Sequence, residues 1–231
     1  MNLENNHKDH RRRLKERYHR EGLDNFEDHN VLELLLFFGI PYKDTNNLAH
    51  ELLNRFGSLS GVLEASREEL MSVNGIGENA ATLFNLIPAL SRKYLEDKVD
   101  EKAPMNSCSA VGNYLIAKYR FRQDELFSMI CLDQSCRLRS WEIISSGTIN
   151  VTAVNSRKVI EAAMKTSANA VILAHNHPNG LAIPSGDDIK STIALVEALN
   201  IIDVRVLDHI IISGDDFVSL ASSQQYKHIF K

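Results

Sequence analysis

The sequence has little of what would place the protein in an oxidising compartment or a membrane. Only three of its 231 residues are cysteine (Cys108, Cys131 and Cys136), and no two of them form a C-x-x-C pair. The odd number argues against a disulfide framework and a cysteine-based metal site. The opening residues, MNLENNHKDH, lack the basic-then-apolar pattern of an export signal. The longest apolar run, LELLLFFGI at residues 32–40, is too short to cross a bilayer. We therefore expect a cytoplasmic protein with reduced thiols and no membrane partner.

Charge is nearly balanced overall but uneven along the chain. The formal net charge is -4, so bulk composition does not indicate a nucleic-acid-binding protein. Residues 8–20 nevertheless carry seven lysines and arginines against two acidic residues. Such a basic segment is able to touch nucleic acid, although a basic helix is more often a solvated face.

The first part of the chain has a helical pattern throughout. Helices are predicted in VLELLLFFGI (31–40), LAHELLNRF (48–56), SREELMSV (66–73) and NAATLFNLIPALSRKYLED (79–97). Ser66 followed by Glu69 fits a capping box, and Gly39, Gly57 and Gly75 are helix-stop residues. These signals predict an all-α domain at residues 1–98.

The predicted secondary structure changes from all-helical to alternating strands and helices after a charged, apolar-poor segment. Residues 96–106 contain Pro104, and we place a linker at residues 99–106 and a second domain at residues 107–231. Strands are predicted at 126–133, 137–148, 170–175, 203–212 and 217–221, alternating with helices at 110–119, 156–167 and 187–200. This alternation predicts an α/β or α+β sandwich.

Two histidines flank one asparagine at the end of the strand AVILAH. Side chains alternate along a strand, so His175 and His177 point to the same side. Two imidazoles and one carboxylate form a metal site with a position left for water, whose pKa such a metal lowers to about 7. Asp187 and Asp188 both begin the next helix and are candidates for the acid. Ser185-x-x-Asp188 also fits an ordinary capping box.

The full spacing is more specific than the histidine pair. His175-x-His177-Pro178 followed by Ser185-x-x-Asp188 resembles the JAMM motif of MPN+ metalloproteases, H-x-H-P and then S-x-x-D. The resemblance implies a cytidine-deaminase-like αβ sandwich, zinc as the metal, and His175, His177 and Asp188 as its ligands. It therefore selects Asp188 over Asp187.

A hydrolase of this kind also needs a general base. The resemblance implies a glutamate at the junction of the first helix and first strand of the domain. Glu125 has that position, and Glu142 in the second strand is the alternative. The resemblance also gives Ser185 a part in stabilising an oxyanion. Asn176 is expected to shape the loop, and the pair Asp208–His209 is interpreted as structural.

The resemblance extends along most of the chain. HRRRLKERYHREGLDNF, LELLLFFGIPYKDTNNLAHELLNRFGSL, NGIG and RVLDHIII are together similar to the RadC family of bacterial proteins, which is named for DNA repair. The family joins a helix-hairpin-helix region to the metal domain, and it usually has serine where this chain has Asn179. In such hairpins the backbone of the G-x-G turn, here Gly75 and Gly77, contacts a DNA phosphate. Glu78 follows directly, and no cation comes before Arg92.

Two functions are predicted from these features. The first is a zinc-dependent hydrolase of amide or isopeptide bonds that acts on a protein or peptide. The second is a DNA-associated binding protein in which the metal domain is structural or vestigial. The metal motif carries the first prediction, and the NGIG turn with the basic N-terminal segment carries the second.

Overall fold

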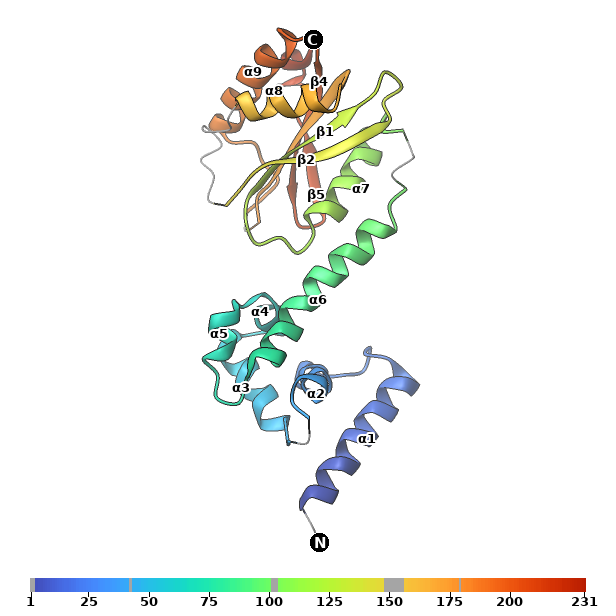
Figure 1. Cartoon of the computed structure of the whole chain (residues 1–231), viewed down its shortest axis with the longest axis vertical. Coiled ribbons are helices and arrows are strands. Elements are labelled where there is room, and N and C mark those ends of the chain that lie inside the picture. Colours follow the sequence, from blue (N-terminus) through green and yellow to red (C-terminus); the bar gives the residue numbers. More distant parts are fainter. Residues whose placement is uncertain (1–2, 42, 101–103, 148–155, 179) are drawn as a thin grey trace. The chain divides into compact units, whose positions relative to one another are not determined.

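The computed structural model describes residues 3–41, 43–100, 104–147, 156–178 and 180–231. The chain divides into two compact units, Met1–Ser91 and Arg92–Lys231, which are coloured blue to green and green to red in Figure 1. The division falls within helix α6 (Glu78–Asp97). Residues 99–106 lie only partly within the described part of the chain, so the linker stays a prediction.

The N-terminal unit is helical, as predicted. Its helices are α1 (Leu3–Glu21), α2 (Asp28–Gly39), α3 (Asn46–Phe56), α4 (Leu59–Glu64), α5 (Arg67–Met71) and the first part of α6. The apolar faces of α2 to α6 meet in a core that includes Leu36, Leu52, Leu70 and Phe84, and Leu14 of α1 packs separately against Leu34 and Phe37 of α2. Burial of these periodic apolar positions is the main force that holds short helices in place.

The predicted helix boundaries are local features that the structure reproduces. The Ser66 side chain accepts from the backbone N–H of Glu69, and the Glu69 carboxylate accepts from the backbone N–H of Ser66. Helix α3 ends at Gly57, which has a left-handed φ of 83°. Gly75, between α5 and α6, has a φ of 98°. These positions favour glycine because a Cβ is strained there.

The C-terminal unit is built on a mixed five-stranded sheet of order β2-β1-β3-β4-β5. Its elements are α7 (Cys108–Tyr119), β1 (Leu126–Leu132), β2 (Leu138–Ser146), α8 (Ser156–Lys165), β3 (Ala170–Asn176), α9 (Gly186–Asn200), β4 (Arg205–Ser213), β5 (Asp216–Ser219) and the 3-10 helix η2 (Lys227–Phe230). Strands β3 and β4 are parallel. The other neighbouring pairs are antiparallel.

Helices cover both faces of this sheet (Figure 1). Helices α8 and α9 pack on one face, where Val159 and Leu195 meet Met129 and Leu173. Helix α7 packs on the other face with Tyr114 and Leu115, against strand residues that include Ile130, Ile172 and Ile210. Strand β3 is buried on both faces, as expected for a central strand between two helical layers.

An irregularity in β4 decides which way its later side chains point. Val171 pairs with Val206, but the next residue, Ile172, pairs with Asp208, so Leu207 is an extra residue in β4. Such a bulge changes the phase of the alternation. His209 consequently pairs with Leu173 and faces the α8/α9 side of the sheet.

The predicted fold is confirmed at the level of a helical N-terminal region followed by an α/β domain. The mixed five-stranded sheet with helices on both faces is consistent with the αβ sandwich that the resemblance to the JAMM motif implies. The helix-hairpin-helix form of the α5–α6 connection stays a prediction. Among the helices that the structure describes, none has the length and apolar character needed to span a membrane.

Candidate metal centre

The end of β3 and the start of α9 bring three metal-ligating side chains together. Atoms of His175, His177 and Asp188 that are able to ligate a metal lie within 4.8 Å of one another. The Nε2 atoms of the two histidines are 3.1 Å apart. Asp188 Oδ1 lies 3.2 Å from Nε2 of His175, and Oδ2 lies 3.8 Å from Nε2 of His177. Asp187, the alternative acid, is exposed and accepts a hydrogen bond from Lys190 instead.

The two oxygens of Asp188 have different surroundings. Oδ2 accepts hydrogen bonds of 2.7 Å from both the backbone N–H and the hydroxyl of Ser185. Oδ1 is buried and has no hydrogen-bond partner among the described residues. Burial raises the pKa of Asp188, and the two hydrogen bonds from Ser185 lower it. A buried, ionised oxygen of this kind requires a cation.

The histidine at the rim of the site presents a lone pair to the same place. His177 Nδ1 lies 2.9 Å from the carbonyl oxygen of Leu181. Because a carbonyl only accepts, this nitrogen carries the proton and Nε2 of the neutral ring is left as an acceptor. Nε2 therefore faces His175 and Asp188 with a lone pair. The donor set of two imidazoles and one carboxylate fits zinc, with room for a further ligand.

A third histidine, whose side chain is fully buried, stands behind His175. His209 Nε2 lies 2.8 Å from Nδ1 of His175. On its other side, His209 Nδ1 lies 2.6 Å from the hydroxyl of Thr192 in α9. Burial lowers the pKa of His209 well below its ordinary value, and His175 lowers it further, so its ring is neutral. Sequence reasoning interpreted His209 as structural because the bulge that turns it toward His175 leaves no local signal.

The asparagine between the two histidines also has a specific contact. Its Oδ1 accepts a 2.7 Å hydrogen bond from the backbone N–H of Leu126, and its Nδ2 donates to the carbonyl oxygen of Asp124 at 3.1 Å. These two bonds hold the backbone on both sides of Glu125. Asn176 therefore joins the metal loop to the segment that carries the predicted base.

Strand register separates the two candidate bases. Phe127 pairs with His175 in the antiparallel β1–β3 ladder, and the same register continued by two residues beyond the strands would bring Glu125 level with His177. The Phe127 ring stacks on that of His175, so these two paired residues lie on the same face of the sheet. Glu142 is on β2, where it pairs with Met129 of β1. It is thus two strands away from β3, roughly 10 Å across the sheet. The register favours Glu125.

The remaining predicted residues have different positions. Ser185 is the N-cap of α9, and its hydroxyl donates to Asp188 Oδ2 while accepting from the backbone N–H of Asp188. An oxyanion contact would require that hydroxyl to turn away from Oδ2. Asp208 is buried and accepts from Ser219 and from the backbone of Ala221, so it ties β4 to the chain after β5. Asn179 lies outside the described residues.

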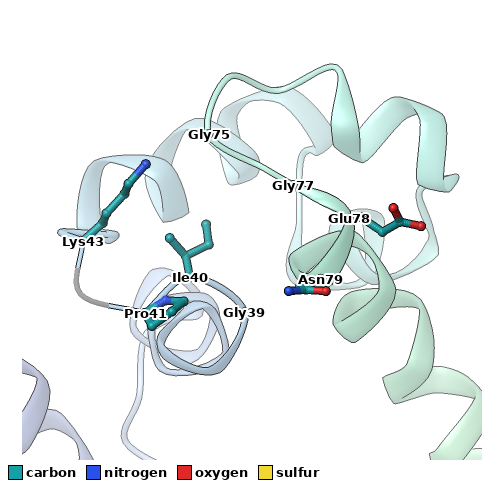
Figure 2. A pocket seen from close by; sticks show the side chains of 8 residues that line it. All are labelled: Gly39, Ile40, Pro41, Lys43, Gly75, Gly77, Glu78 and Asn79. Carbon is teal, nitrogen blue, oxygen red and sulfur yellow. The ribbon is translucent and has the colours of Figure 1, made fainter.

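Gly75 and Gly77 belong to the N-terminal unit and line a pocket of about 330 Å³ with Lys43, Glu78 and other residues between α2 and α6. Figure 2 shows Lys43 and Glu78 on opposite sides of this pocket. The Glu78 carboxylate accepts a 2.7 Å hydrogen bond from Arg67. The acid that follows the turn is therefore paired, and sequence reasoning missed Lys43 because it is distant from the turn along the chain.

Comparison with known proteins gives two family matches. Residues 105–226 match the RadC-like JAB domain, and residues 6–82 match the UPF0758 N-terminal domain. An UPF0758 protein of Pseudoalteromonas translucida (strain TAC 125) is 38% identical over 90% of this chain and 93% of its own length. UPF0758 proteins of Idiomarina loihiensis and Saccharophagus degradans are 35% and 34% identical over the same shares. The chain therefore belongs to the UPF0758 (RadC) family.

Proposed function

We propose that the protein is a zinc-dependent hydrolase of amide or isopeptide bonds in a protein or peptide substrate. The observation that carries this proposal is the convergence of His175, His177 and Asp188, within 4.8 Å, around a buried and unsatisfied carboxylate oxygen. When bound there, zinc supplies Lewis-acid chemistry that polarises a carbonyl and makes water more acidic.

The chain's own residues have distinct parts in the proposed reaction. Glu125 accepts the proton of the attacking water and later delivers it to the leaving amine. Phe127, two residues after Glu125, pairs with His175 and stacks on its ring, which supports this part. Ser185 supplies a hydroxyl beside the ligand Asp188, for a developing oxyanion. Asn176 keeps the Glu125 segment against the loop that carries both histidines.

The proposal is tested with zinc-loaded protein and a mixture of peptides and isopeptide-linked peptides. We expect the wild-type protein to cleave a subset of them, a chelator to stop cleavage, and added zinc to restore it. Asp188→Asn is expected to cleave none of them. Cleavage that continues in Asp188→Asn, or that survives full removal of the metal, would contradict the proposal.

A second candidate function is DNA binding through the N-terminal unit. Its support is the pocket at the NGIG turn, where Lys43 adds a cation and Arg67 neutralises Glu78. Helix α1 contributes less to the proposed DNA binding than its basic composition suggests. Arg11 donates to the carbonyl of Ile40, and Arg12 and Arg20 have acidic partners within α1. Lys43 is therefore the cation that best fits a phosphate contact at the turn.

Binding to short single-stranded and branched DNA, measured against salt concentration, tests this second function. We expect affinity to fall as salt rises. Lys43→Ala should reduce the slope of log affinity against log salt by about one, the value for one lost phosphate contact. Lys93→Ala, on the exposed part of α6, is the matched control. Binding that ignores salt, or equal slopes in both variants, would contradict a phosphate site at the turn.

A further inference from the structure

A chain of hydrogen bonds runs from α9 to the buried ligand His175. Thr192 Oγ1 lies 2.6 Å from the backbone carbonyl oxygen of Asp188 and also 2.6 Å from Nδ1 of His209. Nε2 of His209 lies 2.8 Å from Nδ1 of His175. Thr192 and His209 are completely buried and His175 is nearly so. Water therefore does not supply alternative partners, and the protons must be shared among these groups.

The position of a single hydroxyl proton sets the direction of the whole chain. Thr192 has one O–H, while the Asp188 carbonyl oxygen is only able to accept. Two oxygens 2.6 Å apart need a proton between them, so Thr192 donates to Asp188. His209 Nδ1 must then carry a proton and donate to Thr192. The two nitrogens of this fully buried ring contact a hydroxyl and another imidazole, neither of which is an anion, so the ring is neutral. It therefore accepts at Nε2, and His175 donates to it from Nδ1.

This direction determines what His175 presents to the site. With its proton on Nδ1, the neutral ring has a lone pair on Nε2. That atom is 3.1 Å from Nε2 of His177, also a lone-pair nitrogen, and 3.2 Å from Asp188 Oδ1. Three electron-rich atoms thus face one another, an arrangement that a metal cation stabilises. The reverse direction would place a proton on Nε2 and block the ligand position.

We propose that His209 and Thr192 are positioning residues that fix the tautomer of His175 for metal binding. The inference rests on the metal site of the proposed function and adds two residues to it. An imidazole takes the place of the carboxylate or carbonyl that commonly orients a ligating histidine. It reaches that place because the extra residue Leu207 turns His209 to the α8/α9 face of the sheet. Helix α9 thus supplies both a ligand, Asp188, and Thr192, the first residue of the hydrogen-bonded series that leads to His175.

The test combines zinc affinity with a direct measurement of the tautomer. Affinity is measured by competition with a chelating indicator, using wild-type protein, His209→Leu and His209→Gln. Leucine lacks an acceptor for His175, and we expect it to weaken zinc binding by about 10–100-fold. Glutamine has both an acceptor and a donor and is expected to restore most of the affinity. Thr192→Val and Thr192→Ser form a second pair, with loss expected only in the valine variant.

Long-range proton–nitrogen NMR identifies which ring nitrogen of each histidine carries a proton. We expect the proton on Nδ1 in both His175 and His209, with and without zinc. Wild-type affinity in His209→Leu, equal weakening in folded His209→Gln and His209→Leu, or a proton on Nε2 of His209 would overturn the inference. Neither readout involves peptide cleavage. If the protein binds zinc and the variants behave as expected but no peptide is cleaved, only the proposed function is refuted. If the protein binds no zinc, the positions of the protons on His175 and His209 still test the inference.

Discussion

Two helices of this protein begin with the same capping arrangement, but the capping acid is exposed in one and buried in the other. At α5, Ser66 and Glu69 exchange bonds between side chains and backbone, and the Ser66 hydroxyl also donates to the carboxylate. At α9, Ser185 and Asp188 repeat all three contacts. In both cases one carboxylate oxygen accepts both bonds from the serine. The local geometry of the two helix starts is thus the same.

The second carboxylate oxygen is where the two helix starts differ. Glu69 is exposed, so water solvates its remaining oxygen. Asp188 is 1% exposed, and its remaining oxygen, Oδ1, lies 3.2 Å from Nε2 of His175. The capping box at α9 therefore holds the proposed metal ligand in place as well as beginning a helix. A capping motif indicates a functional site only when its acid is buried beside other ligands.

The largest change in cleavage rate is expected from replacing Glu125, the proposed base at the metal site beside the buried capping box. For a peptide that the zinc-loaded protein cleaves, Glu125→Gln should lower the rate by roughly 10²–10⁴-fold, because the proton acceptor is lost. Zinc content should stay at the wild-type level. Glu142→Gln is the matched control, and its rate should be unchanged. Equal losses in the two variants would remove Glu125 from the proposed mechanism.

A smaller effect is expected when the link between the metal loop and Glu125 is cut. Asn176→Ala removes both bonds to the backbone around Glu125 while its side chain bonds to neither histidine. We expect the cleavage rate to fall about 10–100-fold, as when other supporting partners of metal sites are lost. Zinc affinity, measured by the same indicator competition, should stay near the wild-type value. An unchanged rate would mean that Asn176 serves only the fold.

Removing each serine compares the two caps as structural elements. Ser66→Ala and Ser185→Ala should each lower the free energy of unfolding of the metal-free protein by about 1 kcal/mol, because each loses a capping acceptor. Chemical denaturation monitored by circular dichroism measures this. Only Ser185→Ala should also weaken zinc binding, since its hydroxyl orients Asp188. Weaker zinc binding in Ser66→Ala would contradict the separation of the two roles.

The smallest effect is a pH dependence at the exposed cap. Hydrogen bonds from Ser66 lower the pKa of Glu69. A lowered pKa means that its stabilising contribution is complete above the unfolded value of about 4.3 and is lost as pH falls through the lower folded value. The stability difference between wild type and Glu69→Gln should therefore shrink below about pH 4. Denaturation curves at several pH values measure it, and a difference that grows toward low pH would contradict the assigned sign.

The elements could be predicted from sequence because their signals are local. The pattern 79–97 became α6 (Glu78–Asp97), and the strand predicted at 170–175 became β3 (Ala170–Asn176). Apolar periodicity, caps and glycine stops are properties of short segments. The mixed order of the sheet depends on pairings between distant segments, and the sequence predicted only its α/β class.

The same holds for the site: residues close together in the sequence could be predicted, and contacts between distant segments could not. His175, His177 and Asp188 lie within one segment; the residues alone left Asp187 and Asp188 open as the acid, and the resemblance to the JAMM motif selected Asp188. The choice between Glu125 and Glu142 needed the strand register, and the place of His209 behind His175 depends on the bulge at Leu207. Asn176 was expected to shape its loop, and its contacts with the chain around Glu125 became visible only when β1 and β3 were paired.

The carboxylate of Asp188, at the buried cap of α9, is the proposed metal ligand on which the two helix starts differ. Metal content by mass spectrometry tests it most directly, on wild-type protein, Asp188→Asn and the matched variant Glu69→Gln, all purified without a metal-affinity tag or chelator. We expect about one zinc per chain in wild type and Glu69→Gln, the stoichiometry of a single three-ligand site, and much less in Asp188→Asn. No zinc in the wild type, or equal zinc in all three proteins, would contradict a metal site at Asp188.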